Sequence, residues 1–238
     1  MNPRMTSDQL TALQQLNTCT MANAIETFGV RLRNEGYCCD ASVRCLFPKL
    51  PVICGHAVTV KIRCSSPPPN VKEHSYLDRN DWWDELLRIP APRVVVVQDV
   101  DERPGTGSFI GEVHANILLA LGCVGALTNG AVRDLPAVEA AGFQLFAGSV
   151  TVSHAYSHIV GVGGEVEIGG LKICPGDLLH GDLHGVVSVP PEIAAEVPAA
   201  AARLAEKERR IAALCRGGEF SLEKLRAAIR SVDGSERS

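Results

Sequence analysis

The sequence predicts a single α/β domain, and three observations lead to this fold class. Between residues 93 and 152, apolar strand-like runs alternate with short helical segments, which is typical of βαβ units. From residue 160 to 190 the pattern changes to short strands separated by the turn sequences GG, PGD and HGD, so an antiparallel or barrel-like portion is expected. The 238 residues, 46% of them hydrophobic, suffice for one large core.

Two helices are expected to open the chain. Thr6 and Gln9 have the spacing of a capping box, so the first helix begins near Ser7. A second helix is expected from about residue 20 to residue 28, with Gly29 placed to end it. Both look like packing helices, because their apolar residues recur at helical spacing.

A strand and a chain break follow. ICGHAVTVKIRC, residues 53–64, alternates apolar and polar residues as a strand does. SSPPPN, residues 65–70, then breaks the pattern, because consecutive prolines fix φ and remove backbone donors. We expect this break to be a loop within the domain, since strand patterns resume beyond it.

The remaining elements follow in chain order. Helices are expected at 81–89, 112–121, 135–142, 193–215 and 221–232, the last capped by Ser221, and strands at 93–100, 123–132 and 143–152. The final DGSERS is expected to fray. We therefore expect an N-terminal helix in residues 1–17, a single α/β domain in 18–217, and a C-terminal helix with a frayed tail in 218–238.

Composition limits the classes of function. The net charge of −4 argues against a nucleic-acid surface built on bulk charge. The nine cysteines are odd in number and form no CxxC pair, so we interpret them as reduced thiols of a cytoplasmic protein. The polar start MNPRMTSDQLTALQQL shows no membrane-targeting run, so no membrane partner is expected.

Arg133 and Asp134 are two charges directly after the strand CVGALTNGAV, where ligands of open α/β sheets usually bind. Arginine has donors that match a carboxylate, and aspartate can hold a hard divalent cation through oxygen. Together they suit a small anionic substrate bridged to a metal. Residue types alone leave open a plainer interpretation: a surface ion pair, or Asp134 capping the following helix.

The segment ERPGTGSFIG matches neither GxGxxG nor GxxxxGK[ST], so we do not expect nucleotide binding there. Its glycines, Gly105, Gly107 and Gly111, are interpreted as bringing the backbone close to a small ligand beside Glu112. An ordinary flexible loop is the alternative.

Two parts of the chain carry a family resemblance. In the first, Glu112 is separated by twenty positions from the pair Arg133–Asp134. The second is the block GG-PGD-D-G-VP, made by Gly169, Gly170, Pro175, Gly176, Asp177, Asp182, Gly185, Val189 and Pro190. With these motifs the chain resembles, from about residue 18 to 217, the family that contains 4-hydroxy-4-methyl-2-oxoglutarate aldolase and the regulator of ribonuclease E activity A.

The resemblance implies a fold and an assembly. Members have an α/β fold with a swivelling β/β/α domain, here with a central sheet, N-terminal helices and a long C-terminal helix. They form trimers or pairs of trimers with sites between subunits, so a homotrimer or hexamer is expected. A glutamate from the neighbour's C-terminal helix completes the site; the best match is Glu208, with Glu206 second.

The resemblance also implies roles for particular residues. Asp134 matches the protein ligand of Mg²⁺ or Mn²⁺, and Arg133 matches the arginine that holds the substrate and stabilises charge on its keto oxygen. Glu112 matches the acidic residue that positions a water on the metal, and the backbone amides of Val113 and His114 match those that bind the pyruvyl carboxylate. The expected activity is retro-aldol cleavage of a 4-hydroxy-2-oxo-dicarboxylic acid, or decarboxylation of oxaloacetate, releasing pyruvate through an enolate.

This sequence departs from the family pattern at two positions. The aldolases carry aspartate where this chain has Glu112, and His114 places an imidazole beside the amides expected to bind pyruvate. The ring either lines the pocket or faces solvent. Two other functions stay open: a non-catalytic regulator that binds an RNA-processing enzyme, and another metal-dependent enzyme acting on a related oxo-acid. Asp134 favours an enzyme, since the regulator branch lacks this aspartate.

The other conspicuous side chains are given plain interpretations. His180 and His184 lie among turn residues and are not expected to form a metal site, and neither are His154 and His158. The adjacent Trp82 and Trp83 are expected to pack in the core or at a subunit contact.

Overall fold

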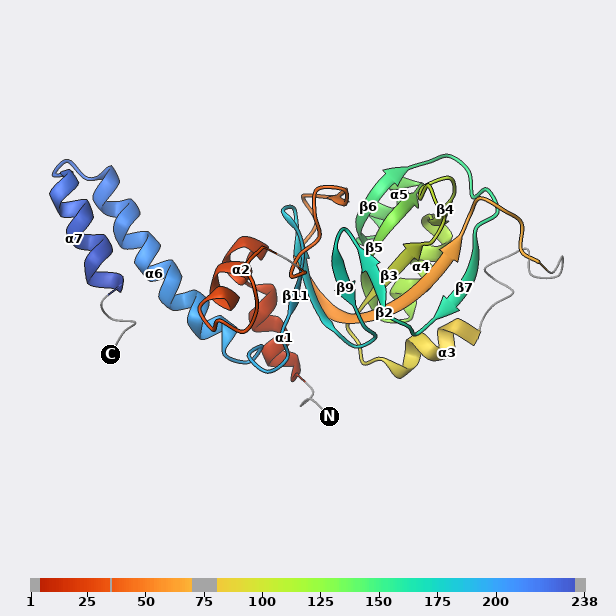
Figure 1. The fold of residues 1–238 in the computed structure, drawn as a ribbon, viewed down its shortest axis with the longest axis horizontal. Coiled ribbons are helices and arrows are strands. Elements are labelled where there is room, and N and C mark those ends of the chain that lie inside the picture. The colour runs from red at the N-terminus through yellow and green to blue at the C-terminus, as the bar shows by residue number, and fades with distance from the viewer. Residues whose placement is uncertain (1–4, 35, 70–80, 234–238) are drawn as a thin grey trace.

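The computed structural model describes residues 5–34, 36–69 and 81–233 (Figure 1). Its helices are α1 (Ser7–Gln14), α2 (Thr18–Glu26), α3 (Asp81–Arg88), α4 (Glu112–Ala120), α5 (Leu135–Ala140), α6 (Val197–Arg216) and α7 (Leu222–Asp233). Its strands are β1 (Arg44–Cys45), β2 (Ile53–Arg63), β3 (Arg93–Asp99), β4 (Ser108–Ile110), β5 (Cys123–Val132), β6 (Gln144–Val150), β7 (His158–Val162), β8 (Val166–Ile168), β9 (Leu171–Ile173), β10 (Leu178–Asp182) and β11 (Gly185–Val189).

Nine of these strands form one mixed sheet. Its order is β1-β6-β5-β3-β2-β10-β11, with β4 beside β5 and β7 beside β2. The neighbours β2, β3, β5 and β6 are parallel, whereas β10 pairs antiparallel with both β2 and β11. The βαβ pattern and the antiparallel portion predicted from the sequence are therefore confirmed. Strands β1 and β4, of two and three residues, were not predicted.

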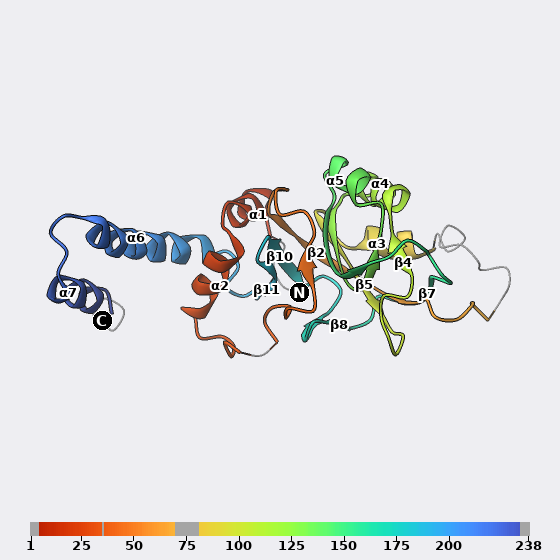
Figure 2. The same cartoon turned by 90° about the horizontal axis from the view of Figure 1, so that it is seen from above.

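Both faces of the parallel part are covered. Apolar side chains of β2, β3 and β5 pack on one face against α3, α4 and α5, and on the other against the β8–β9 hairpin. Figure 2 shows α4 and α5 on the side of the sheet opposite β8. The alternation seen in residues 53–64 is present in β2 only in part. Thr59 is 1% exposed in the middle of the strand, whereas His56 and Lys61 are partly exposed and Arg63 is exposed.

The N-terminal helices are held against β10 and β11. The predicted capping box of Thr6 and Gln9 is present, and α1 and α2 share a core with the start of α6. The Thr18 amide donates to Asp182 Oδ2 at 2.9 Å, and the Thr18 hydroxyl lies 3.1 Å from His180 Nδ1. His180 is fully buried, and burial lowers the pKa of its ring. This histidine thus joins α2 to the sheet.

The C-terminal helices project from the body as a two-helix arm, residues 202–230 (Figures 1 and 2). The buried residues of α6 are Val197, Ala200 and Ala201, all in its first two turns. Ser221 caps α7 as predicted, since its hydroxyl accepts from the Lys224 amide at 3.1 Å. The predicted fraying of DGSERS concerns residues almost wholly outside the described range. None of the described helices combines the length and apolar character needed to cross a bilayer.

Candidate functional site

The candidate site lies where the parallel strands end. Strand β5 finishes at Val132, and the Arg133 amide then donates to the Ile110 carbonyl of β4 at 3.1 Å. This bond places the Arg133–Asp134 pair directly beside the start of α4. The short strand β4, which the sequence did not reveal, therefore brings Glu112 and Arg133 together.

Asp134 has an unusual backbone. Its φ of 56° and ψ of 35° lie in the left-handed region, which disfavours most residues other than glycine. It stands at the N-cap position of α5, but its side chain makes no capping hydrogen bond. The capping interpretation is therefore wrong. The left-handed turn instead directs the carboxylate toward the start of α4.

The contacts of the Asp134 carboxylate differ between its two oxygens. Oδ2 accepts the Glu112 amide at 3.1 Å and lies 3.3 Å from Arg133 Nε. Within the described part of the chain, no hydrogen bond involves Oδ1. The side chains of Arg133 and Asp134 are 31% and 37% exposed. One carboxylate oxygen is thus available to a cation beside a fixed guanidinium.

Gly111 is required by this arrangement. A Cβ at this position would lie 2.5 Å from Asp134 Oδ2 and 3.1 Å from Arg133 Cγ. Any larger residue would push the carboxylate and the guanidinium away from the α4 start. Of the three glycines, Gly111 is the one whose space is taken up by site side chains.

Gly105 and Gly107 serve packing. A Cβ on Gly105 would lie 2.6 Å from the Ser149 hydroxyl oxygen, and one on Gly107 would overlap the His154 carbonyl. Protein atoms thus occupy the space into which a side chain at either position would extend; that these two glycines bring the backbone close to a ligand stays a prediction. The segment follows β3 and is held by hydrogen bonds at Asp101, Gly105 and Ser108.

The N-terminus of α4 offers backbone donors. Its N-cap is Gly111, which has no side chain to cap the first amides, and the Glu112 amide is used by Asp134. The next amides are those of Val113 and His114, and Val113 is 60% exposed. First-turn amides and the helix dipole together favour an anion. The expected carboxylate site at these amides fits this geometry.

The His114 side chain points into the core. It is 1% exposed, and its ring makes edge contacts with Trp82 and Phe109 at centroid distances of 5.5 and 4.6 Å. Nδ1 lies 2.9 Å from the Phe109 carbonyl, and burial lowers the pKa of the ring to about 4. The expectation of a solvent-facing or pocket-lining imidazole is therefore wrong; only the His114 amide belongs to the candidate site. Trp82 is fully buried, so its packing role is confirmed.

Glu208 lies on the arm, at the end of the molecule away from α4 and α5 (Figures 1 and 2). Within one chain it cannot meet Asp134. Glu206 is paired within its own helix, since Arg209 and Arg210 both bond its carboxylate and lower its pKa to about 2. No ion pair of Glu208 is found among the described residues. Of the two glutamates, Glu208 is the one that remains available to a second subunit.

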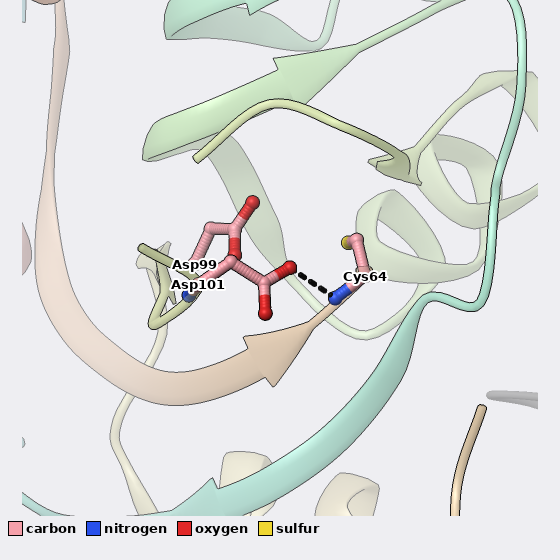
Figure 3. Close-up of side chains that lie close together, drawn as sticks. All are labelled: Cys64, Asp99 and Asp101. Carbon is pink, nitrogen blue, oxygen red and sulfur yellow. Dashed lines mark hydrogen bonds between the residues drawn. The ribbon is translucent and has the colours of Figure 1, made fainter. Parts of the chain in front are cut away.

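A second group of possible ligands lies at the same edge of the sheet. Cys64, Asp99 and Asp101 bring ligand atoms within 4.8 Å of one another (Figure 3). Sequence reasoning missed both aspartates, although QDVD, residues 98–101, spans the end of the buried β3 strand. The hydrogen bonds of the two aspartates indicate whether this group can bind a metal. All nine cysteines are free thiols, as predicted.

Comparisons with known proteins agree with this fold. Over 88 residues the chain is 34% identical to a Halalkalibacterium halodurans protein provisionally named 4-hydroxy-4-methyl-2-oxoglutarate aldolase, a match that covers 36% of this chain and 41% of that protein. The chain thus spans less than half the length of this relative.

Two solved structures share the fold. An uncharacterized protein from Pseudomonas syringae pv. tomato superposes with a TM-score of 0.72 at 23% identity, over 95% of this chain and 96% of that one. Streptomyces coelicolor RraAS2, described as an unusual member of the RNase ES inhibitor RraA protein family, gives a TM-score of 0.66 at 22% identity, over 87% of this chain and 97% of that one. At these identities the likeness concerns the fold alone.

A family model described as RraA-like, Aldolase/RraA, matches residues 18–188, a range that contains β5, the Arg133–Asp134 pair and the start of α4. With this match over well beyond half its length, the chain belongs to the RraA-like aldolase/RraA family.

Proposed function

We propose that this protein is a divalent-metal-dependent lyase that cleaves a 4-hydroxy-2-oxo-dicarboxylic acid, or decarboxylates oxaloacetate, and releases pyruvate. The observation that carries the proposal is the Asp134 carboxylate, held in a left-handed turn with Oδ2 engaged and Oδ1 open beside Arg133. A side chain that only stabilised the fold would gain more by capping α5.

The residues present fit a hard divalent cation. Asp134 offers a carboxylate oxygen, the ligand type that Mg²⁺ and Mn²⁺ prefer, and a single protein carboxylate leaves most of the ion's positive charge uncompensated. When bound there, such an ion would supply Lewis-acid stabilisation of negative charge on the substrate's keto oxygen.

The other residues would orient the substrate and handle protons. The amides of Val113 and His114 would bind the carboxylate next to the keto group, and the Arg133 guanidinium would stabilise the charge that develops on the keto oxygen. Cleavage of the C3–C4 bond requires loss of the proton from the 4-hydroxyl. A water held by the Glu112 carboxylate would accept this proton and later return one to C3 of the leaving pyruvate.

We further propose that the site is completed across a subunit boundary in a homotrimer or hexamer. Glu208 is too far along the arm to reach the site of its own chain, and it is not bound within its helix as Glu206 is. A neighbour's arm would bring this carboxylate to the water held by Glu112.

The first experiment measures pyruvate release, coupled to lactate dehydrogenase, from oxaloacetate and from 4-hydroxy-4-methyl-2-oxoglutarate. Wild type is compared with Mg²⁺, with Mn²⁺ and with EDTA, against metal-only blanks because divalent ions alone decarboxylate oxaloacetate. Asp134→Asn removes the charge but tolerates the left-handed backbone, so loss of activity reports on the carboxylate. Glu139→Gln, an exposed carboxyl on α5, is the matched control.

We expect metal-dependent pyruvate release that falls at least about 100-fold in Asp134→Asn and is unchanged in Glu139→Gln. Activity that survives both EDTA and Asp134→Asn would contradict the proposed role of Asp134. Absence of pyruvate from either substrate, together with stoichiometric capture of a ribonuclease, would instead identify a binding protein.

A further inference from the structure

Asp99 is a buried residue whose carboxylate connects the end of β3 to the segment that follows it. It ends β3, is 2% exposed, and accepts the Asp101 amide on Oδ1 at 3.1 Å and the Gly105 amide on Oδ2 at 2.8 Å. Asn129 of β5 fixes its backbone from the other side, accepting from the Asp99 amide at 2.8 Å and donating to the Asp99 carbonyl at 2.9 Å. Both oxygens of this side chain therefore serve amides of the segment after β3.

Asp101 ties the same segment to the end of β2. Its Oδ2 accepts the amides of Cys64 and Ser65 at 2.8 and 2.7 Å, and its Oδ1 accepts the Ser65 hydroxyl at 2.7 Å and lies 3.4 Å from Arg63 Nε. Figure 3 shows the bond from the Cys64 amide. Burial alone would raise the pKa of Asp101, but these donors outweigh burial and lower it.

These contacts argue against a metal site at Cys64, Asp99 and Asp101. All four carboxylate oxygens already accept hydrogen bonds, which use part of their capacity to bind a cation. The Cys64 thiol is directed at the Gly107 carbonyl at 3.6 Å, and burial raises its pKa to about 11, which keeps it protonated. A protonated thiol is a poor metal ligand.

The rest of the segment is fastened as well. The Ser108 amide donates to the Ser153 carbonyl at 2.9 Å, and His154 Nδ1 lies 3.0 Å from the Ser108 carbonyl. The segment then runs into Gly111, where the space for a side chain is filled by Asp134 and Arg133. A displacement of this segment would therefore also displace the first backbone amides of α4.

We propose that Asp99 and Asp101 are positioning residues that anchor residues 100–110, so that Gly111 holds the start of α4 against Asp134. The catalytic part of this inference rests on the proposed lyase function, whereas the anchoring part does not. Neither carboxylate touches the substrate; both act through the loop.

Asp99 and Asp101 accept from different kinds of donor, so their variants are expected to differ in severity. Asp99→Asn must turn an amide NH₂ toward a backbone N–H, because both oxygens of Asp99 face such donors. Asp101→Asn can keep its oxygen on the Cys64 and Ser65 amides and turn its NH₂ to the Ser65 hydroxyl, which can accept. Asp101→Ala loses every bond. Asp99→Asn and Asp101→Ala are thus expected to be severe, and Asp101→Asn mild.

Hydrogen–deuterium exchange of the amides in residues 101–113 is measured together with kcat, KM and bound metal. We expect exchange at least about tenfold faster and kcat roughly 10 to 100-fold lower in the two severe variants, with metal stoichiometry unchanged. Asp177→Asn is the matched control. Asp177 is a half-buried aspartate that accepts the Cys174 amide at 2.7 Å, and its loss should leave exchange in residues 101–113 unaltered.

The outcomes separate this inference from the proposed function. Unchanged amide exchange in Asp99→Asn and Asp101→Ala would overturn the proposal that the two aspartates anchor the segment. Loss of bound metal in either variant would also overturn it. So would an increase in exchange in Asp101→Asn as large as that in Asp101→Ala. If wild type releases no pyruvate, the lyase proposal fails, yet exchange still decides whether the two aspartates hold the loop.

Discussion

Asp134 adopts a strained backbone conformation that places its carboxylate beside the start of α4. A non-glycine residue in the left-handed region costs roughly 1 kcal/mol or more, and it persists where the surroundings hold it. Here the Glu112 amide and the Arg133 guanidinium hold it. Such outliers gather at functional sites, which is why this backbone supports the proposed role.

Replacing Asp134 by glycine should therefore separate stability from activity. Asp134→Gly is expected to raise the midpoint of thermal unfolding by a few degrees, or leave it unchanged, because the strain is relieved. Pyruvate release should be lost. Ala155, at φ 47°, is the second non-glycine residue in this region among those described, and Ala155→Gly is the stability control. A clear destabilisation of Asp134→Gly alone would mean that the carboxylate stabilises the fold.

At the residue scale, the sequence predicted the charged pair but not its surroundings. Arg133 and Asp134 could be picked out because charges rarely follow an apolar strand, and Glu112 could be picked out through the family resemblance. Asp99 and Asp101 also stand at the end of an apolar strand, but their role could not be predicted, because their partners, Cys64 and Asn129 among them, are about 30 or more positions away. The inward turn of His114 was not predicted either, although this residue lies on the buried face of α4 together with Ala115 and Leu118.

At the element scale, most boundaries could be predicted. Long strands and capped helices carry their own signals, and β5 was predicted with its observed bounds. Strands β1 and β4 were missed because two or three residues give no periodicity. Strand β2 was predicted, but the near-complete burial of Thr59 within it could not be predicted from the alternation.

The burial of two histidines between elements predicts acid sensitivity. His114 joins α4 to α3 and β4, His180 joins α2 to β10, and burial lowers both pKa values, that of His114 to about 4. In the unfolded chain each histidine binds a proton below about pH 6.5, whereas in the folded protein the buried ring stays neutral to lower pH. The free energy of unfolding should thus be constant above pH 6.5 and fall below it, by up to about 1.4 kcal/mol per pH unit for each ring.

Urea unfolding at several pH values between 7.5 and 5 measures this loss. His114→Leu has similar volume and cannot titrate, so its free energy of unfolding should be lower at pH 7.5, from the lost bond to Phe109, but should change less on acidification. An equal pH dependence in wild type and His114→Leu would show that His114 is not the titrating group.

At the scale of the whole molecule, the candidate site and the arm lie at opposite ends. If Glu208 completes a neighbour's site, two inactive variants should complement each other. Glu208→Gln and Asp134→Asn are each expected to be inactive as pure assemblies. After co-refolding at equal amounts, up to about one quarter of the sites would combine a wild-type Asp134 with a wild-type Glu208.

The readout is pyruvate release after mixing, with native mass spectrometry to verify mixed trimers or hexamers. Glu206→Gln mixed with Asp134→Asn is the control, and here Glu206→Gln alone should already be active. Mixed assemblies without recovered activity would place Glu208 outside the site.

The arm and the rest of the chain carry opposite net charges. Residues 202–230 contain eight lysines and arginines but four glutamates, whereas the whole chain has a net charge of −4, so the remainder is strongly acidic. A basic arm laid on an acidic neighbour gains long-range attraction that salt screens within about 10 Å at 0.1 M. If the arm lies on a neighbour in this way and Glu208 completes that neighbour's site, ionic strength controls how firmly the subunits hold one another and, through Glu208, the rate of turnover.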